Sequence, residues 1–266
     1  MTEGENREMK QIRYLKIDMQ RAFGTWKMGI ASMGVCISLL YNSDGTSDVL
    51  SWLHNISGNA ILIMAALVFA IYPYAGTFCE DMEYCYDRQM VLRGSAVAYT
   101  LSKIITVFLS AVFAMFSGFL LATLFLIVRY GFPDAETVQG VMENCGSLYS
   151  PLLLDRHYIL FAFCIDLHLS FLAGIMAVIG LMCSLFVKNR MLVYILPVSF
   201  LYIEDILIQR LLGWEQGSLF SLNCMGITTL GTSLETHTWQ LYYFEIFMLL
   251  LFFGAVICLK YRRKVA

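Results

Sequence analysis

Ionisable side chains inside long apolar stretches are the residues of this sequence that could do chemistry. They are Asp166, His168, Glu204, Asp205 and Glu245. An ionisable side chain in hydrocarbon is costly, and it usually faces a cavity or a partner charge. Glu204 lies thirteen residues after Met191, where its apolar run begins, which is about 20 Å along a helix. We therefore expect Glu204 and the adjacent Asp205 to lie deep in a membrane.

Four of these residues and Arg210 form a candidate pathway or vestibule, whose members are Asp166, His168, Glu204, Asp205 and Arg210. Asp166 is expected near the outer interface, because a helix of about 20 residues that ends at Val187 begins near Leu167. His168 is also explained by a hydrogen-bonded position at that interface. The two deeper acids can line a water-accessible vestibule between two membrane subunits, or they can form a structural pair with a charge on another helix.

Motifs of catalysis, nucleotide binding and metal binding give little support for an enzyme. The chain has no G-x-x-x-x-G-K-[ST] loop, so any ATP and Mg²⁺ would be bound by a partner ATPase. It has no H-E-x-x-H or C-x-x-C, which argues against a metal site. Glu204-Asp205 with Arg210 resembles the Glu-Glu-x-x-x-Arg motif of intramembrane CAAX-type proteases, but Gln209 occupies the arginine's place. A membrane-embedded enzyme of that type is therefore one alternative, and a non-transporting membrane sensor or scaffold is another.

Six apolar runs are near or above the length that a helix needs to cross a bilayer, and they predict an all-α membrane protein. The runs are Gly24–Tyr41, Asn59–Gly76, Leu101–Val128, Tyr158–Val187, Met191–Leu211 and Leu241–Leu259. A charged fraction of 14% excludes an ordinary soluble domain, in which about 25% of residues are charged. The net charge of −2 gives no indication of nucleic-acid binding.

The basic residues are distributed unequally over the two sides of this six-span arrangement. Fifteen of the 18 Lys and Arg residues fall on one side, and Arg129, Arg156 and Arg210 fall on the other. Lys and Arg near spans are retained in the cytoplasm during insertion. We therefore expect a multi-pass protein of the cell membrane with both termini in the cytoplasm.

Residues 1–23 are expected to form an amphipathic interfacial helix before the membrane domain of residues 24–266. Its apolar stripe consists of Met9, Ile12, Leu15, Met19 and Ala22. Basic residues occupy much of the remaining surface, which is typical of a helix that lies on an anionic leaflet of membrane lipids. A solvated N-terminal helix is the alternative.

The segment at residues 77–100 is expected to form a short acidic helix, a break and the start of the third span. Phe78, Met82, Cys85 and Gln89 share one face of this helix, and acids line the others. Gly94-Ser95 interrupts the pattern, and Ser95 can cap the helix that follows. A short charged helix on the cytoplasmic face is suited to touching another protein, although its charges could also serve only to keep a loop soluble.

Two segments on the outer side are expected to differ from each other. Asn42–Gly58 is short and polar, and it predicts a loop. Gly217–Leu234 has no charged residue but several Gly, Ser and Thr residues, so it is too polar for a span and too apolar for a free loop. A re-entrant element within residues 212–240, buried against protein, satisfies both observations.

The segment Phe78-Cys79-Glu80-Asp81, followed by Arg93-Gly94-Ser95 and by Tyr99-x-x-x-Lys103, is similar to a pattern in ABC-2-type transporter permeases. In that family an acidic stretch and a turn of basic and small residues precede the third span. The predicted layout of interfacial helix, six spans and re-entrant element also resembles these permeases over the whole length.

The resemblance implies an exporter subunit without catalysis of its own. Its partners would be two copies of a cytosolic ABC ATPase, which binds the ATP and Mg²⁺, and a second permease subunit, the same or homologous. The residues that would couple to the ATPase are Phe78, Glu80, Asp81, Met82, Glu83, Arg88 and Arg93. The sequence does not indicate the cargo.

Overall fold

The computed structural model describes residues 3–41, 48–58, 60–86, 89, 95–131, 138, 152, 155–212 and 238–265. All regular elements in these ranges are helices, as the sequence predicts. They are α1 (Glu3–Phe23), α2 (Trp26–Leu40), α3 (Val49–Gly58), α4 (Ala60–Ile71), α5 (Thr77–Glu83), α7 (Ala96–Tyr130), α10 (Tyr158–Cys183), α11 (Arg190–Leu212) and α13 (Thr238–Val265). The proposed re-entrant element falls mostly outside the described residues.

Long apolar helices identify the chain as a multi-pass membrane protein. Among the described residues, α7, α10 and the Tyr243–Arg262 part of α13 are long and apolar enough to cross a membrane. Arg13–Phe23 and Trp26–Leu40 together meet the same criterion, but they are bent by 55° at the break between them. The described helices therefore provide three spans, or four when this bent pair counts as one.

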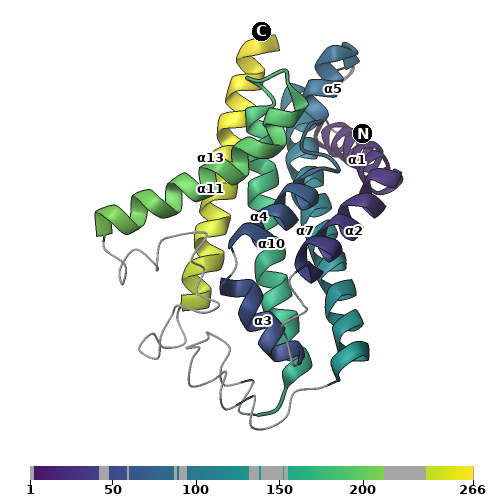
Figure 1. Cartoon of the computed structure of the whole chain (residues 1–266). Helices are drawn as coiled ribbons and strands as arrows, with labels where there is room; N and C mark the ends of the chain where they lie inside the picture. Colours follow the sequence, from purple (N-terminus) through teal and green to yellow (C-terminus); the bar gives the residue numbers. More distant parts are fainter. Residues whose placement is uncertain are drawn as a thin grey trace.

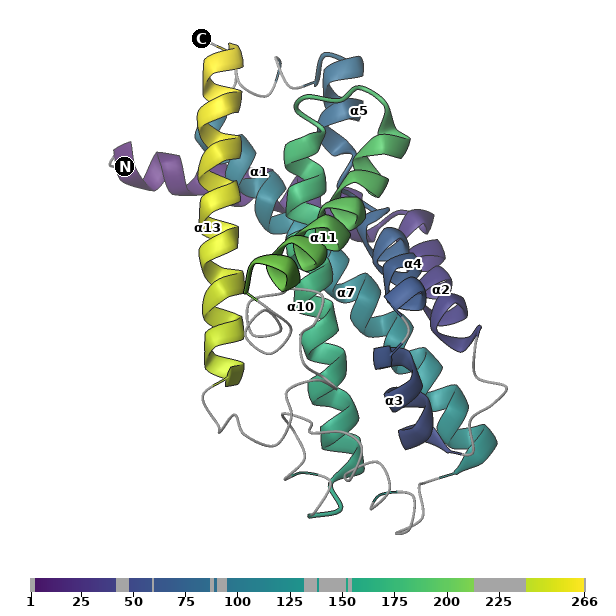
Figure 2. The ribbon, with the colours of Figure 1, turned by 60° about the vertical axis from the view of Figure 1, so that its left-hand side comes forward.

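The prediction of six spans is not supported, because two apolar runs do not form long helices aligned with the others. Helix α4 has 12 residues, which is about 18 Å, and it is followed by a series of turns from Tyr72 to Gly76. Pro73 in these turns has no N–H with which to continue a helix. Helix α11 runs obliquely across the bundle rather than along α7, α10 and α13 (Figures 1 and 2).

Helices α2, α4, α7 and α10 form the packed centre of the bundle, and α1, α11 and α13 lie around them. Small residues allow neighbouring helices to approach each other closely. A Cβ atom on Gly118 of α7 would lie 2.7 Å from the Ser32 carbonyl oxygen of α2, and one on Gly174 of α10 would lie 2.6 Å from the Phe108 ring of α7. Close packing at glycine is common between membrane helices, where apolar lipid provides no hydrophobic drive for association.

The segment Asn42–Gly58, which we expected to be a polar loop, contains helix α3. Asp48 accepts hydrogen bonds from the backbone N–H groups of Leu50 (2.8 Å) and Ser51 (2.9 Å), so its carboxylate caps this helix. Trp52 is buried, and its indole N–H donates to the carbonyl of Leu39 at 3.2 Å. The loop prediction was wrong because it rested on the polarity of the segment, whereas the polar Asp48 starts a helix here.

Candidate functional site

A buried network of charges lies where α1, α5 and α7 meet, at the end of the bundle toward which both termini lie (Figure 1). Helix α1 contributes Asp18, α5 contributes Asp81 and α7 contributes Lys103. The side chains of all three are at most 4% exposed. Tyr99 and Lys103 are four residues apart on α7, so they share one face of that helix.

The Lys103 ammonium group is fully hydrogen-bonded within the network. Its Nζ atom lies 2.9 Å from Asp18 Oδ1, 2.8 Å from Asp81 Oδ2 and 3.0 Å from the Tyr74 hydroxyl. An ammonium group has three N–H donors and no acceptor, so these three oxygens match its capacity. The positive charge is therefore both neutralised and solvated by protein atoms.

The two carboxylates are held as completely as the ammonium. Asp18 accepts hydrogen bonds from the Tyr74 and Ser102 hydroxyls, each at 2.6 Å. Asp81 accepts one from the Tyr99 hydroxyl at 2.5 Å, and its other oxygen lies 3.0 Å from Nη2 of Arg21. Two acids and two bases therefore balance, which is the condition under which buried charges can stabilise rather than destabilise a fold.

Asp81 belongs to α5, outside the membrane-spanning helices, and its surroundings favour the ionised form. Burial acts to raise the pKa of Asp81, but the charge of Lys103, the hydrogen bonds from Lys103 and Tyr99, and the charge of Arg21 hold it below its usual value. The carboxylate therefore stays ionised at neutral pH. Because its charge is paired inside the chain, Asp81 has little attraction left for an outside partner.

An aromatic layer lies beside the charges and joins α5 to α7 and α13. The Phe78 ring is stacked on Tyr261, with centroids 5.5 Å apart and an angle of 14°, and it lies 6.1 Å from the Tyr99 ring. Phe78, Tyr99 and Tyr261 are all fully buried. Burying three large rings contributes several kcal/mol of hydrophobic stabilisation, about 1.5–3 kcal/mol for a side chain such as Phe.

Ion pairs nearer the surface connect α5 to two further helices. Glu80 lies 2.9 Å from Lys27 Nζ on α2 and 3.3 Å from Arg190 Nη1 on α11. Glu83 also pairs with Arg190. The three acids of α5 thus contact bases on α1, α2, α7 and α11, and Phe78 adds α13. Every one of these helices is joined to α5 by a charged or aromatic contact.

The predicted coupling residues therefore divide into two groups. Phe78 and Asp81 face the interior, while Glu80 and Met82 are half-buried and Glu83 is exposed. A charged helix suited to touching another protein was expected here, but the structure pairs the acids of α5 with bases of the same chain. The expected apolar face is also shorter than predicted, because α5 ends at Glu83 and Cys85 has a positive φ of 54°. Arg88 and Arg93 lie outside the described residues.

The predicted pathway residues are not brought together in the described part of the chain. Asp166 and His168 are both buried in α10, but Asp166 lines a cavity with α3 and α7, whereas the His168 ring lies 6.1 Å from Tyr243 of α13. Arg210 is exposed on α11. Glu204 and Asp205 belong to α11, but their side chains are outside the described part, so the vestibule stays a prediction.

Sequence reasoning missed the contribution of α1 to the network. The buried face of α1 includes Tyr14, Asp18 and Ala22, while Leu15 and Met19 of the predicted stripe are only half-buried. The stripe was displaced because Asp18 was counted among the polar residues. A usable signal was present in Lys103, a lysine inside an apolar run, since such a residue requires a buried partner.

Neither a metal site nor a comparison with known proteins assigns a function to the chain. No group of three or more His, Cys, Asp and Glu side chains that could hold a metal ion occurs in the part of the chain that the structure describes. No protein-family model, curated protein or solved structure matches the chain. The geometry of the network is therefore the basis for a functional proposal.

Proposed function

We propose that this chain is the membrane-embedded permease subunit of an ABC-type exporter, with α5 as the element that receives motion from a separate cytosolic ATPase. The observation that carries the proposal is the set of contacts of α5. This helix is only seven residues long, yet its acids are bonded to bases on α1, α2, α7 and α11.

Such contacts make α5 a suitable point for transmitting force. A displacement of α5 would pull on Asp81 and, through Lys103, on the 35-residue helix α7. Through Glu80 it would also pull on the starts of α2 and α11. Packed helices move as rigid bodies, so a small shift at one end can change the opening of the whole bundle.

The proposed assembly contains two ATPase copies and two permease subunits, with ATP and Mg²⁺ bound by the ATPases. The proposed topology has six crossings with both termini in the cytoplasm, in which α2, α4 and α11 supply the three crossings beyond α7, α10 and α13. The excess of Lys and Arg on one side supports this orientation. Reporter fusions after Asn144 and after Lys264 should report opposite compartments, and equal signals would contradict the topology.

A photo-crosslinking experiment tests the ATPase contact. In one variant benzoylphenylalanine replaces Tyr84, which follows α5 and is 73% exposed. In the control it replaces Tyr41, which is 82% exposed and directly follows α2. Tyr41 is about 21 Å along that helix from Lys27, the residue of α2 that pairs with Glu80. In native membranes, Tyr84 should crosslink to a P-loop ATPase, and the purified complex should hydrolyse ATP. Tyr41 should give no such crosslink.

Two results would contradict the proposal. If position 84 captures no nucleotide-binding protein, the chain is better explained as a sensor or scaffold. If positions 84 and 41 capture the same ATPase equally, the contact is unrelated to α5. Glu80→Gln removes the charge that pairs with Lys27 and Arg190. It should reduce ATP-driven transport more than it reduces ATPase binding, because in this proposal Glu80 transmits motion and does not bind the ATPase.

A further inference from the structure

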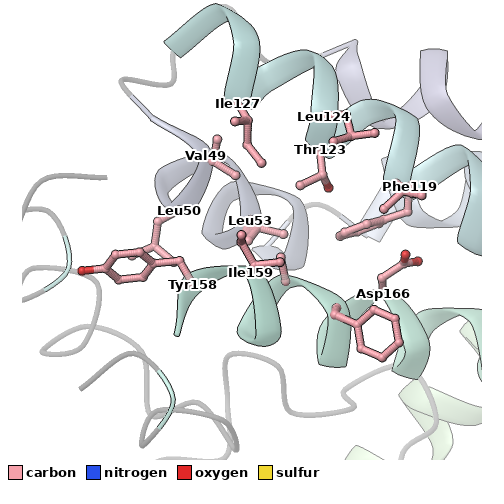
Figure 3. Close-up of a pocket in the computed structure, with 13 residues that line it drawn as sticks. Val49, Leu50, Leu53, Phe119, Thr123, Leu124, Ile127, Tyr158, Ile159 and Asp166 are labelled. Atoms are coloured by element: carbon pink, nitrogen blue, oxygen red, sulfur yellow. The ribbon is translucent and has the colours of Figure 1, made fainter. Parts of the chain in front are cut away.

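A largely apolar cavity lies between α3, α7 and α10, toward the end of the bundle opposite α5 (Figures 1 and 3). Its volume is about 160 Å³. An enclosed protein cavity near 150 Å³ is large enough to bind benzene, and this one has a similar volume, although Leu124 and Ile159 of its lining are also exposed at the surface. Leu, Ile and Val side chains make up much of its wall, so an apolar group of one ring would be well accommodated.

One carboxyl group breaks this apolar lining. Asp166 of α10 is 2% exposed, and Figure 3 shows its carboxyl group directed toward the side of the cavity formed by α7. Among the described residues, its hydrogen bond is with the Ser170 hydroxyl, 3.3 Å from Oδ1. A buried carboxyl group in apolar surroundings stays ionised only beside a counter-charge, and one neutral hydroxyl does not supply it.

The described bases near this end of the molecule do not neutralise Asp166. The described lining contains no Lys, Arg or His. Arg156 and His157 are exposed and line an adjoining hollow, which shares Tyr158, Ile159 and Phe163 with the cavity, and neither forms an ion pair with Asp166. Arg129 lies over the ring of Tyr130 at 5.0 Å. His168 is on α10, but it faces Tyr243 of α13. The counter-charge is therefore missing from the described lining.

Further polar and aromatic groups line the same cavity. Thr123 of α7 lines the cavity at 7% exposure, and its buried hydroxyl oxygen has no hydrogen-bond partner within the described residues. Phe119, Tyr158 and Phe163 place three aromatic rings in the same lining. Aromatic faces attract cations, and quaternary ammonium groups are commonly bound in this way.

We infer that this cavity binds an organic ammonium ion whose apolar part is about the size of a benzene ring. The rings and aliphatic walls hold the apolar part, and Asp166 supplies the negative charge that fixes the ammonium group. The inference does not rest on the proposed transport function, because a cavity of this kind can bind a ligand in a transporter, a sensor or a scaffold.

A pair of matched photoprobes tests the inference on the full chain in lipid nanodiscs. One probe is benzyltrimethylammonium bearing a diazirine on its ring, and the other is the same molecule with a carbon atom in place of the nitrogen. The charged probe should label peptides of α3, α7 and α10 saturably. The neutral probe should require a concentration at least about thirtyfold higher, since losing one partner of a buried charge pair typically costs that much in affinity.

Three variants separate the charge from the cavity. Asp166→Asn should weaken labelling by the charged probe at least about thirtyfold and leave the neutral probe unchanged. Glu245→Gln makes the same chemical change in a half-buried acid of α13 that does not line the cavity, so both probes should label it as they label the unaltered chain. Ala162→Phe places a ring in the cavity and leaves Asp166 itself unchanged, and it should abolish saturable labelling by both probes.

The inference is overturned by any of three results. One is saturable labelling by the charged probe that does not depend on Asp166, and another is equal labelling by the two probes. The third is no saturable labelling of the unaltered chain. If Asp166→Asn fails to elute as a folded protein in gel filtration, Ala162→Phe still decides the location, because continued saturable labelling of a filled cavity would place the site elsewhere.

Discussion

Asp81 and Asp166 are buried to almost the same extent, 1% and 2% exposed, but their surroundings are opposite. Asp81 is bonded to Arg21, Tyr99 and Lys103, so its charge is fully compensated inside the chain. Asp166 has a weak hydrogen bond from Ser170 among the described residues and lines an apolar cavity. Burial alone therefore does not indicate what an acid does in a membrane protein. The number and charge of its partners distinguish an acid that joins helices from one that is suited to a ligand.

The largest effect should come from removing the central base of the network. Lys103→Met keeps the length of the side chain but leaves Asp18 and Asp81 with one base, Arg21, between them. The free energy of unfolding should fall by about 3–5 kcal/mol, as is usual when one partner of a buried ion pair is removed. Unfolding by sodium dodecyl sulfate in mixed micelles measures it.

Lys27→Met is the matched control for that variant. Lys27 pairs with Glu80 at 2.9 Å, but its side chain is 30% exposed, so its loss should cost no more than about 1 kcal/mol. Equal losses of unfolding free energy in the two variants would show that the buried network stabilises the fold no more than a surface ion pair does.

The second prediction compares the same substitution in the two regions. Asp81→Asn should lower the free energy of unfolding by about 3 kcal/mol, because it leaves the buried Lys103 and Arg21 with one fewer negative charge. Asp166→Asn should change it by less than about 1 kcal/mol without ligand, because the loss of a weak hydrogen bond is offset by removing an uncompensated charge. If Asp166→Asn is as destabilising as Asp81→Asn, then Asp166 has a structural partner and the comparison fails.

The third prediction concerns a single hydrogen bond. Tyr99→Phe removes the hydroxyl that donates to Asp81 at 2.5 Å and leaves the ring in place beside Phe78 and Tyr261. Unfolding stability should fall by about 1.5–3 kcal/mol, the range for a hydrogen bond to a charged group. Tyr84→Phe, at an exposed position after α5, should stay within about 0.5 kcal/mol of the unaltered chain. A neutral result for Tyr99 would mean that Lys103 and Arg21 alone hold the carboxylate.

The smallest effect is a dependence of stability on acid pH. The pKa of Asp81 in the folded chain is held below its usual value, so its contribution to stability is fully present above the unfolded pKa of about 4. The contribution is lost as pH falls from there through the lowered folded pKa, with a slope of at most about 1.4 kcal/mol per pH unit. Unfolding measured between pH 7 and pH 3 should show no loss from Asp81 above about pH 5. Asp81→Asn should have a shallower acid slope than the unaltered chain, and identical slopes would contradict this pairing.

The sequence predicted much of the local structure because hydropathy and turn residues are local signals. The third, fourth and sixth apolar runs correspond to α7, α10 and α13. Helix α7 begins directly after Ser95, as the break at Gly94-Ser95 predicts, although the Ser95 side chain makes no capping hydrogen bond. The short helix α5 also occurs where the acidic pattern placed it. Hydropathy could not show that Pro73 and its neighbours form turns, or that α11 lies across the bundle, so the count of six spans was too high for the described helices.

The candidate site was only half predictable for a physical reason. Tyr99 and Lys103 could be placed on one face of α7 from their spacing, and Asp81 could be placed on α5. Their meeting depends on the turn between α4 and α5, which brings Tyr74 and Asp81 back to α7, and on the packing of Asp18 from α1. Such contacts join residues that are up to 85 positions apart, Asp18 and Lys103, and no periodic pattern in a single segment encodes them.

By itself, the sequence determined that this is an all-helical membrane protein, because the lengths of hydrophobic runs and the fraction of charged residues are sums over residues that do not depend on their neighbours in space. Only the tertiary structure decided which acids are compensated. The energy of a buried charge depends on atoms within a few ångströms of it, and in Asp81 and Asp166 those atoms come from different helices. The same residue type, equally buried, therefore joins α5 to α1 and α7 at one end of the bundle and lines an apolar cavity near the other.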